Sequence, residues 1–230
     1  MPGRIGRRTA ACASMERQAL FLMDAKTMFT LFQMMERVLA KVLPKRNQGG
    51  GWVSLRARIR GASSQVHVER GAFVQEYASL LCKGKESKIE IGAGTFINPY
   101  AKLNTTTSGF IKIGKNCSIH SFCVLYGAGG LTIGDHVRMA THAIVVGGNH
   151  GFDDPDLPLH EQQPTKKGIK IGDDVWIGAG VIILDGVTIG PHAVIGAGSV
   201  VTRDIPAESV AMGVPAKVTR MRGDKKKPLA

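Results

Sequence analysis

Aromatic residues make up only 6% of the 230-residue chain, whereas glycine occurs 29 times. So few large rings and so many turn-forming residues argue against a helical bundle and against a thick sandwich core. The apolar fraction of 43% is nevertheless ordinary for a globular protein. The composition therefore favours a β-repeat architecture with a narrow interior.

Cysteine is also scarce, and its spacing excludes the common cysteine-based sites. The four cysteines, Cys12, Cys82, Cys117 and Cys123, form no CxxC pair, so neither a metal site nor a disulfide framework is indicated. We expect them to fill space in the core. No apolar stretch of the kind that a signal peptide needs follows the early arginines, and a cytoplasmic location is expected.

Acidic residues are outnumbered by Lys and Arg, 18 against 30, which gives a formal net charge of +12. Most of the positive charge lies between Arg4 and Arg60 and between Lys217 and Lys227. Neither a zinc-finger spacing nor an RNP-type aromatic pair accompanies it, so nucleic acid is not the expected partner. A field of this sign attracts any anion, and a phosphate-rich small molecule fits it equally well.

The dominant pattern is an aliphatic residue at every sixth position, unbroken through Ile171, Ile177, Ile183, Ile189, Ile195 and Val201. Neither a helix nor an alternating strand has this period. Three such steps make one turn of a triangular coil, as in hexapeptide β-helices, whose turns are stabilised by stacking on their neighbours.

The same count continues towards the N-terminus, with coils that start at Val68, Ile91, Ile113, Ile133, Ile171 and Ile189. Successive starts lie 23, 22, 20, 38 and 18 residues apart. Where two starts are further apart than three steps of six, the additional residues must leave the coil at a corner as a loop. The large excess after Ile133 predicts an extruded loop at 147–168.

Residues 51–212 are therefore expected to form a β-helix domain, between a basic tail with a helical segment at 1–50 and a basic tail at 213–230. Apolar residues at nearly helical spacing predict one or two helices between Met15 and Leu43. Charges such as Asp24 and Glu36 argue against a membrane span, while the flanking arginines are compatible with a peripheral membrane contact.

The segment IKIGDDVWIGAGVIILDGVTIGPHAVIGAGSVVTRDIPAESVAMGVPAKVTR, residues 169–220, resembles the C-terminal half of the hexapeptide-repeat acyltransferases. The resemblance begins near Ile89 and is nearest to the galactoside and maltose O-acetyltransferases and to acetyltransferases of bacterial surface-polysaccharide sugars. It implies an all-β fold, a left-handed parallel β-helix, assembled as a homotrimer. It also implies acetyl-CoA as the donor and no metal.

A histidine opens the predicted loop in the sequence GGNHGFDD, and His150 matches the catalytic histidine of this family. There the loop arches over a groove between two subunits, in which donor and acceptor meet. The resemblance implies that His150 is a general base, which removes the acceptor's proton during direct attack on the thioester. Histidine suits this role because its ordinary pKa of about 6.5 lies near working pH. The neighbouring glycines are expected to let backbone approach a ligand closely: Gly147, Gly148 and Gly151.

The acceptor is expected near this base. His120, in IGKNCSIHSFCV, stands where many relatives carry an asparagine that binds the acceptor sugar, and this departure leaves an amine acceptor open. Trp176, in DDVW, matches an aromatic residue that lines the family's site. The loop adds hydrogen-bonding groups suited to sugars: Asn149, Asp153 and His160. The other histidines within coils are expected to be solvated: His67, His136, His142 and His192.

For the donor, the family binds the pantetheine arm through backbone groups beside the late coils. The matching small residues lie in WIGAG and VIGAG: Gly178, Ala179, Gly196 and Ala197. Thr202 and Arg203 follow, and Lys217 and Arg220 match basic positions near the phosphates of CoA, which cationic side chains suit.

These features predict an acetyl-CoA-dependent acetyltransferase that modifies a hydroxyl of a sugar or polysaccharide precursor. N-acetylation of a nucleotide-linked amino sugar is the alternative. Two hypotheses come from other classes. A γ-carbonic-anhydrase-like metalloenzyme needs a histidine spacing that His136, His142 and His150 do not match. A non-catalytic scaffold on nucleic acid or membrane would use the basic termini and would not require His150 or its loop.

Overall fold

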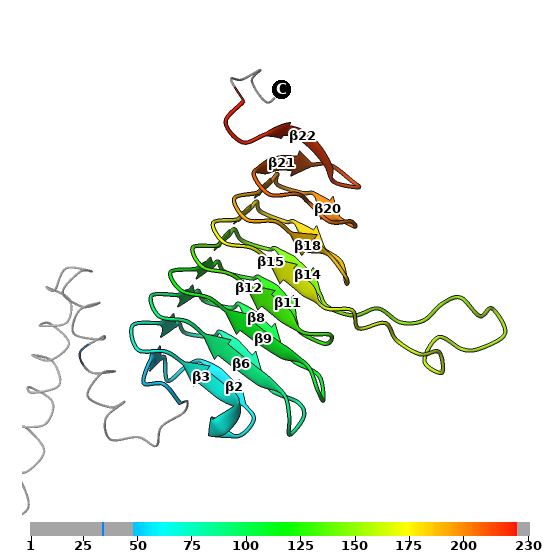
Figure 1. The fold of residues 1–230 in the computed structure, drawn as a ribbon. Helices are drawn as coiled ribbons and strands as arrows, with labels where there is room; N and C mark the ends of the chain where they lie inside the picture. Colours follow the sequence, from blue (N-terminus) through cyan, green and yellow to red (C-terminus); the bar gives the residue numbers. More distant parts are fainter. Residues whose placement is uncertain (1–33, 35–47, 225–230) are drawn as a thin grey trace, which may run out of the picture. The chain divides into compact units, whose positions relative to one another are not determined.

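The computed structural model describes residues 34 and 48–224. Residues 48–224 form a β-solenoid in which the chain passes through three sheets in each coil (Figure 1). Cys12 and the helices predicted between Met15 and Leu43 lie outside the described residues, apart from Met34. No helix within the described part of the chain is long and apolar enough to cross a membrane.

The three sheets are called I, II and III in the order in which the chain visits them. Sheet I has nine strands: β1 (Trp52–Val53), β4 (Phe73–Val74), β7 (Phe96–Ile97), β10 (Ser118–Ile119), β13 (Arg138–Met139), β16 (Trp176–Ile177), β19 (Val194–Ile195), β21 (Ser209–Met212) and β22 (Lys217–Met221). Sheet II has seven: β2 (Arg58–Arg60), β5 (Ser79–Leu81), β8 (Lys102–Asn104), β11 (Val124–Tyr126), β14 (Ile144–Val146), β17 (Ile182–Ile183) and β20 (Val200–Val201).

Sheet III has six strands: β3 (Val66–Val68), β6 (Lys88–Ile91), β9 (Phe110–Ile113), β12 (Leu131–Ile133), β15 (Ile169–Ile171) and β18 (Thr188–Ile189). A short 3-10 turn, Ser63–Gln65, precedes β3. The strands within each sheet pair in parallel, and the pairing of β21 with β22 is the antiparallel exception among the described strands.

The aliphatic residues spaced by six determine the register of the solenoid. The predicted coil starts from Val68 to Ile189 are paired with one another along sheet III. The following members of each series pair in the same way along sheets I and II, as in the row from Leu80 through Leu103 and Leu125 to Val145. These side chains are buried and fill the shaft. The predicted all-β fold, a parallel β-helix, is therefore confirmed.

The three edges between sheets determine where exposed side chains can gather. Edge I/II joins sheets I and II, edge II/III joins sheets II and III, and edge III/I returns the chain to sheet I. Edges I/II and III/I turn through residues in the left-handed backbone region, including Phe122 at φ 63° and His192 at φ 60°. Side chains at these tight turns are directed away from the shaft, where a ligand or a second chain can reach them.

Cys82, Cys117 and Cys123 are free and buried, as predicted for core residues. The Cys123 thiol contacts the carbonyl oxygen of Ala140 at 3.1 Å. Burial raises the pKa of all three thiols, and that of Cys123 to about 11. Each therefore stays protonated at neutral pH, and the thiol is the unreactive form.

We accordingly expect Cys82, Cys117 and Cys123 to resist alkylation by iodoacetamide at pH 8 in the folded protein and to react readily in denaturant. Mass spectrometry of peptides after timed labelling would measure this. Rapid labelling of Cys123 in the native state would contradict both its burial and its raised pKa.

Candidate active site

The predicted loop is present and leaves the solenoid at edge II/III, between β14 and β15 (Figure 1). The outgoing chain stays attached to the preceding coil, because the Gly147 amide donates to the Tyr126 carbonyl at 3.0 Å. The two ends of the loop then pair through Asn149 and Thr165, whose backbone groups exchange hydrogen bonds of 3.1 and 2.9 Å. This pairing, here called the neck, separates the loop from the regular coils.

The glycines near His150 have a role in the neck that the sequence did not predict. A Cβ atom on Gly147 would lie 2.4 Å from the Tyr126 carbonyl oxygen, and one on Gly151 would lie 2.6 Å from that of Gln163. A Cβ on Gly148 would also be tight, 3.1 Å from the Thr165 oxygen. The small residues thus allow the chain to approach itself.

The tip of the loop is organised around one amide side chain. Gln162 Nε2 donates to the carbonyls of Asp154 and Leu157 at 2.7 and 2.9 Å, and its Oε1 accepts from the Asp154 amide at 3.1 Å. Apolar side chains remain exposed beside it, with Phe152 at 74% and Leu159 at 60% of their full area. The tip therefore has a defined backbone and presents an uncovered apolar surface.

The predicted loop residues are all accessible. His150, Asn149 and Asp153 are exposed, and the His150 ring has no hydrogen-bond or ion-pair partner among residues 48–224. The exposed His160 lies with its Nε2 3.6 Å from a carboxylate oxygen of Glu161. Nothing in the described chain prevents a substrate from reaching the His150 imidazole.

A second group of predicted site residues lies on edge I/II. His120 is exposed there, at the turn after β10, and Ala179 and Ala197 are exposed at the turns after β16 and β19. Their neighbours Gly178 and Gly196 pair with the next coil through backbone hydrogen bonds of 2.9 and 2.8 Å. A Cβ on either glycine would be within 3 Å of that coil, so glycine is needed for the stacking itself.

Along the same edge, side-chain size changes abruptly from one coil to the next. The early turns carry stacked rings 5.1 to 5.2 Å apart: Tyr77, Tyr100, Phe122 and His142. The later turns carry Gly180 and Gly198, and a Cβ at either position would meet nothing within 4 Å. Edge I/II is therefore filled by rings in its first half and open in its second half.

The remaining predicted residues are distributed over other surfaces. Trp176 points outward from sheet I in register with Arg138 and is 57% exposed. Thr202 and Arg203 follow β20 on edge II/III, the edge that also carries the loop. Lys217 and Arg220 lie on β22, where Arg220 Nη1 donates to the Met221 carbonyl at 3.2 Å.

Apart from Trp176, Lys217 and Arg220, the predicted residues thus divide between two edges of one chain. His150, Thr202 and Arg203 are on edge II/III, whereas His120, Ala179 and Ala197 are on edge I/II, with the whole of sheet II between them. A single chain does not bring the predicted base and the predicted donor-binding turns together.

The histidines of the metalloenzyme hypothesis are also separated. His136 lies on edge III/I, His142 on edge I/II and His150 on edge II/III. Within the part of the chain that the structure describes, no three His, Cys, Asp or Glu residues are close enough to hold a metal ion.

Comparison with known proteins identifies the family. A family model described as bacterial transferase hexapeptide (six repeats) matches residues 168–203. A hexapeptide-repeat containing acetyltransferase from Vibrio cholerae, solved in complex with acetyl coenzyme A, aligns at 32% identity with a TM-score of 0.53, over 58% of this chain and 71% of that one. This chain belongs to the hexapeptide-repeat acetyltransferase family.

Two curated members of this hexapeptide-repeat family match at higher identity over shorter segments. The galactoside O-acetyltransferase of Escherichia coli is 44% identical over 103 residues, 42% of this chain and 47% of that protein. That of Lactococcus lactis is 45% identical over 92 residues, 40% of this chain and 44% of that protein. The chain spans less than half the length of these relatives. An N-acyltransferase from Bacillus cereus, at 20% identity and a TM-score of 0.56 over 81% of this chain and 87% of that one, shares the fold.

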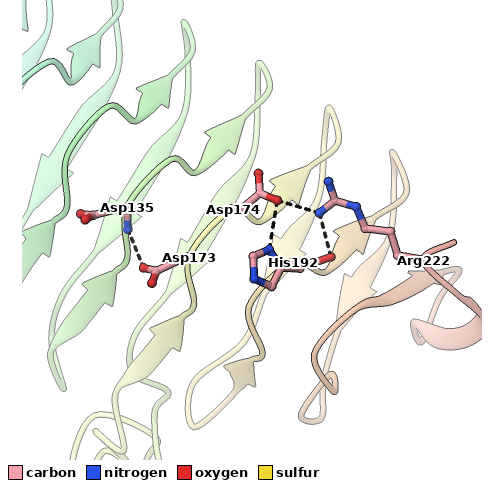
Figure 2. Close-up of polar contacts among 5 residues, drawn as sticks. All are labelled: Asp135, Asp173, Asp174, His192 and Arg222. Atoms are coloured by element: carbon pink, nitrogen blue, oxygen red, sulfur yellow. Dashed lines mark hydrogen bonds and ion pairs between the residues drawn. The ribbon is translucent and has the colours of Figure 1, made fainter.

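One polar cluster of this hexapeptide-repeat chain lies outside the predicted site, on edge III/I (Figure 2). Arg222 Nη1 donates to Asp174 Oδ2 at 2.8 Å and to the His192 carbonyl at 3.2 Å, and His192 Nδ1 lies 3.1 Å from the same Asp174 oxygen. Figure 2 also shows Asp173 accepting from the Asp135 amide of the preceding coil at 2.7 Å. The cluster attaches the segment after β22 to the side of the solenoid.

Hydrogen bonds from His192 and Arg222 lower the pKa of Asp174. We expect Arg222→Gln to raise that pKa towards the ordinary aspartate value of 3.8, because the carboxylate loses a cationic donor. A lowered pKa means that the contribution of Asp174 to stability is present at neutral pH and is lost as the pH falls below about 4. NMR titration of the Asp174 carboxyl carbon in both proteins would test this, and identical midpoints would refute it. The effect on neutral-pH stability should be small, because the groups are half exposed.

The predicted exposure of the coil histidines is correct for His136, His142 and His192, whereas His67 is half-buried on β3. Two of the exposed histidines nevertheless make side-chain contacts: His192 pairs with Asp174, and His142 stacks on Phe122. The sequence contains a signal for the second contact, because ring residues recur on successive coils at the same turn position.

Proposed function

We propose that this protein is an acetyl-CoA-dependent acetyltransferase whose acceptor is a hydroxyl group of a sugar or polysaccharide precursor. The observation that carries the proposal is the extruded loop that presents an accessible His150 where the six-residue period breaks. The family relationship supports it, because the curated relatives are named galactoside O-acetyltransferases and the Vibrio cholerae structure holds acetyl coenzyme A.

We further propose a homotrimer with sites shared between copies, wound as left-handed coils. The predicted base and the open turns at Ala179 and Ala197 occupy different edges, so a complete site requires edge II/III of one copy to face edge I/II of the next. Sheet II, between these edges, supports such a contact with an outward apolar row: Val124, Ile144, Ile182 and Val200. Cytoplasmic location and a peripheral membrane contact of residues 1–50 remain predictions.

In this mechanism, the His150 imidazole accepts the proton of the acceptor hydroxyl while the hydroxyl oxygen attacks the thioester carbonyl carbon. The carbon–sulfur bond then breaks, the acetyl group stays on the acceptor oxygen, and the imidazolium returns the proton to the leaving thiolate. The open half of edge I/II leaves room for the pantetheine arm beside Ala179 and Ala197. Exposed Arg203 and Lys217 supply positive charge for the phosphates of CoA.

Thiol release from acetyl-CoA, measured against a panel of hydroxyl and amino sugars, tests the function. Turnover with hydroxyl sugars is expected. Turnover confined to amino sugars would favour the alternative, N-acetylation, which His120 at the usual asparagine position keeps open. Absence of turnover with every member would count against acetyl transfer.

Subunit complementation tests the shared site. His150→Ala removes the predicted base, and Ala179→Trp fills the predicted donor turn, so each variant alone should be inactive. A site in a mixed trimer works where the intact edge II/III of an Ala179→Trp copy faces the intact edge I/II of a His150→Ala copy. With random mixing about one site in four is of this kind, so roughly a quarter of wild-type activity should return. Light scattering that gave a monomer, or an inactive mixture of verified mixed trimers, would overturn the arrangement.

A further inference from the structure

His142 occupies the boundary between the two halves of edge I/II. It is the last ring of the stack, at φ 61°, and the turn of the next coil carries Gly180 at φ 67°. One face of the imidazole is covered by Phe122, at a centroid distance of 5.1 Å and an interplanar angle of 15°. The other face borders the open half of the edge, because Gly180 has no side chain to continue the stack.

A chain of hydrogen bonds determines which nitrogen of this ring carries the proton. Thr141 Oγ1 donates to the Ser121 carbonyl at 2.7 Å, and the same oxygen lies 2.9 Å from His142 Nδ1. A hydroxyl has one proton, and a carbonyl oxygen can only accept, so this proton is used in the bond to Ser121. Nδ1 must therefore be the donor to Thr141, which leaves Nε2 of the neutral ring as an acceptor.

Orientation and tautomer are thus fixed by different neighbours. Stacking on Phe122 fixes the plane of the ring, and Thr141 fixes its proton. The backbone of the next coil is tied to the same residue, since the Gly180 amide donates to the Thr141 carbonyl at 3.0 Å. A preorganised acceptor is consequently held one coil below Ala179, the turn to which the donor is assigned.

We propose that His142 is a further substrate-contacting residue, whose Nε2 accepts a hydrogen bond from a hydroxyl or amine of the acceptor in the shared groove. This inference rests on the proposed acetyltransferase function and assigns His142 to acceptor recognition, with proton removal left to His150. The ligand is a polyhydroxylated or amino sugar with at least one donor group besides the one that is acetylated.

His142→Phe is the decisive variant. It keeps a ring on Phe122, and Phe122 itself at φ 63° shows that this type of turn accommodates phenylalanine. Only the two ring nitrogens are lost, so kcat/KM for the sugar found by the panel should fall about tenfold, the equivalent of one hydrogen bond. The KM for acetyl-CoA and the melting temperature should change little.

Thr141→Val is the matched variant for the tautomer. It removes the hydroxyl that orients the His142 proton while leaving the imidazole in place, and we expect a smaller loss of acceptor kcat/KM than His142→Phe causes. Nitrogen NMR of histidine-labelled wild-type protein should show a protonated Nδ1 and a lone-pair Nε2 on His142, with the Nε2 signal moving when the sugar panel is added with CoA.

The outcomes separate this inference from the proposed function. Wild-type turnover with an unchanged kcat/KM in His142→Phe would overturn the role of His142 and leave the function intact. If the wild type acetylates no sugar in the panel, the proposed function fails, and the NMR result decides this inference: the opposite tautomer, or an Nε2 signal indifferent to every sugar, would overturn it.

Discussion

Replacement of His150 by alanine is expected to lower the kcat for acetyl transfer by about 10² to 10⁴, the typical contribution of a positioned general base. The protein should remain folded, because His150 lies on the exposed loop and its truncation creates no cavity in the shaft. Such surface changes usually alter stability by no more than about 0.5 kcal/mol. CoA should still bind, since its predicted contacts are Arg203, Lys217 and the turns on edge I/II.

Steady-state kinetics on His150→Ala, together with CoA titration and thermal unfolding, would test each part of this expectation. His160→Ala is the control in the same loop, and we expect it to act mainly through acceptor affinity. If His150→Ala kept a near wild-type kcat while His120→Ala abolished the reaction, the base would be assigned wrongly and would belong to the coil of His120.

The largest expected effect on stability comes from the shaft. Ile111 in β9 is fully buried and stands in register between Ile89 and Leu131 of the adjacent coils. Ile111→Ala should destabilise the protein by about 2 to 5 kcal/mol, because it removes packed atoms and leaves a cavity that the rigid stack cannot close. In a solenoid each coil is stabilised only by its neighbours, so a defect at a middle coil weakens contacts on both sides.

Lys112→Ala is the matched control, one residue further along the same strand. Its side chain is exposed on the outer face of sheet III, and its removal should change stability by no more than about 0.5 kcal/mol. Urea unfolding at one fixed protein concentration would compare both variants with the wild type, because association also contributes to apparent stability. Equal midpoints for the two variants would contradict the assignment of Ile111 to the core.

The period of six predicted the coils because residues at this spacing point into the shaft, where large apolar side chains are buried against those of the adjacent coils. This requirement for burial acts on every coil, and it is why Val68 and Ile189, far apart in the sequence, belong to one row. The loop was predictable for the same reason, because the six-residue period is interrupted there.

The sequence did not reveal how the candidate site is divided. The spacing identifies inward positions, but it contains no information on which outward edges of separate copies face each other. The sequence also did not reveal that the glycines beside His150 pack against the chain's own backbone, because a close approach to ligand and a close approach to backbone require the same residue. The fixed tautomer of His142 depends on Ser121, which comes from the preceding coil, and is therefore a tertiary property.

The neck formed by Asn149 and Thr165 makes the loop a self-contained insertion between β14 and β15. Because the two ends are paired before the chain departs, β14 and β15 keep their places in the solenoid whatever lies between them. A longer loop would add little to the entropic cost of closing it, about 0.6 kcal/mol for each doubling of length. Under the proposed function, replacement of residues 151–164 is expected to change acceptor preference, while His150 and the coils of the solenoid stay in place.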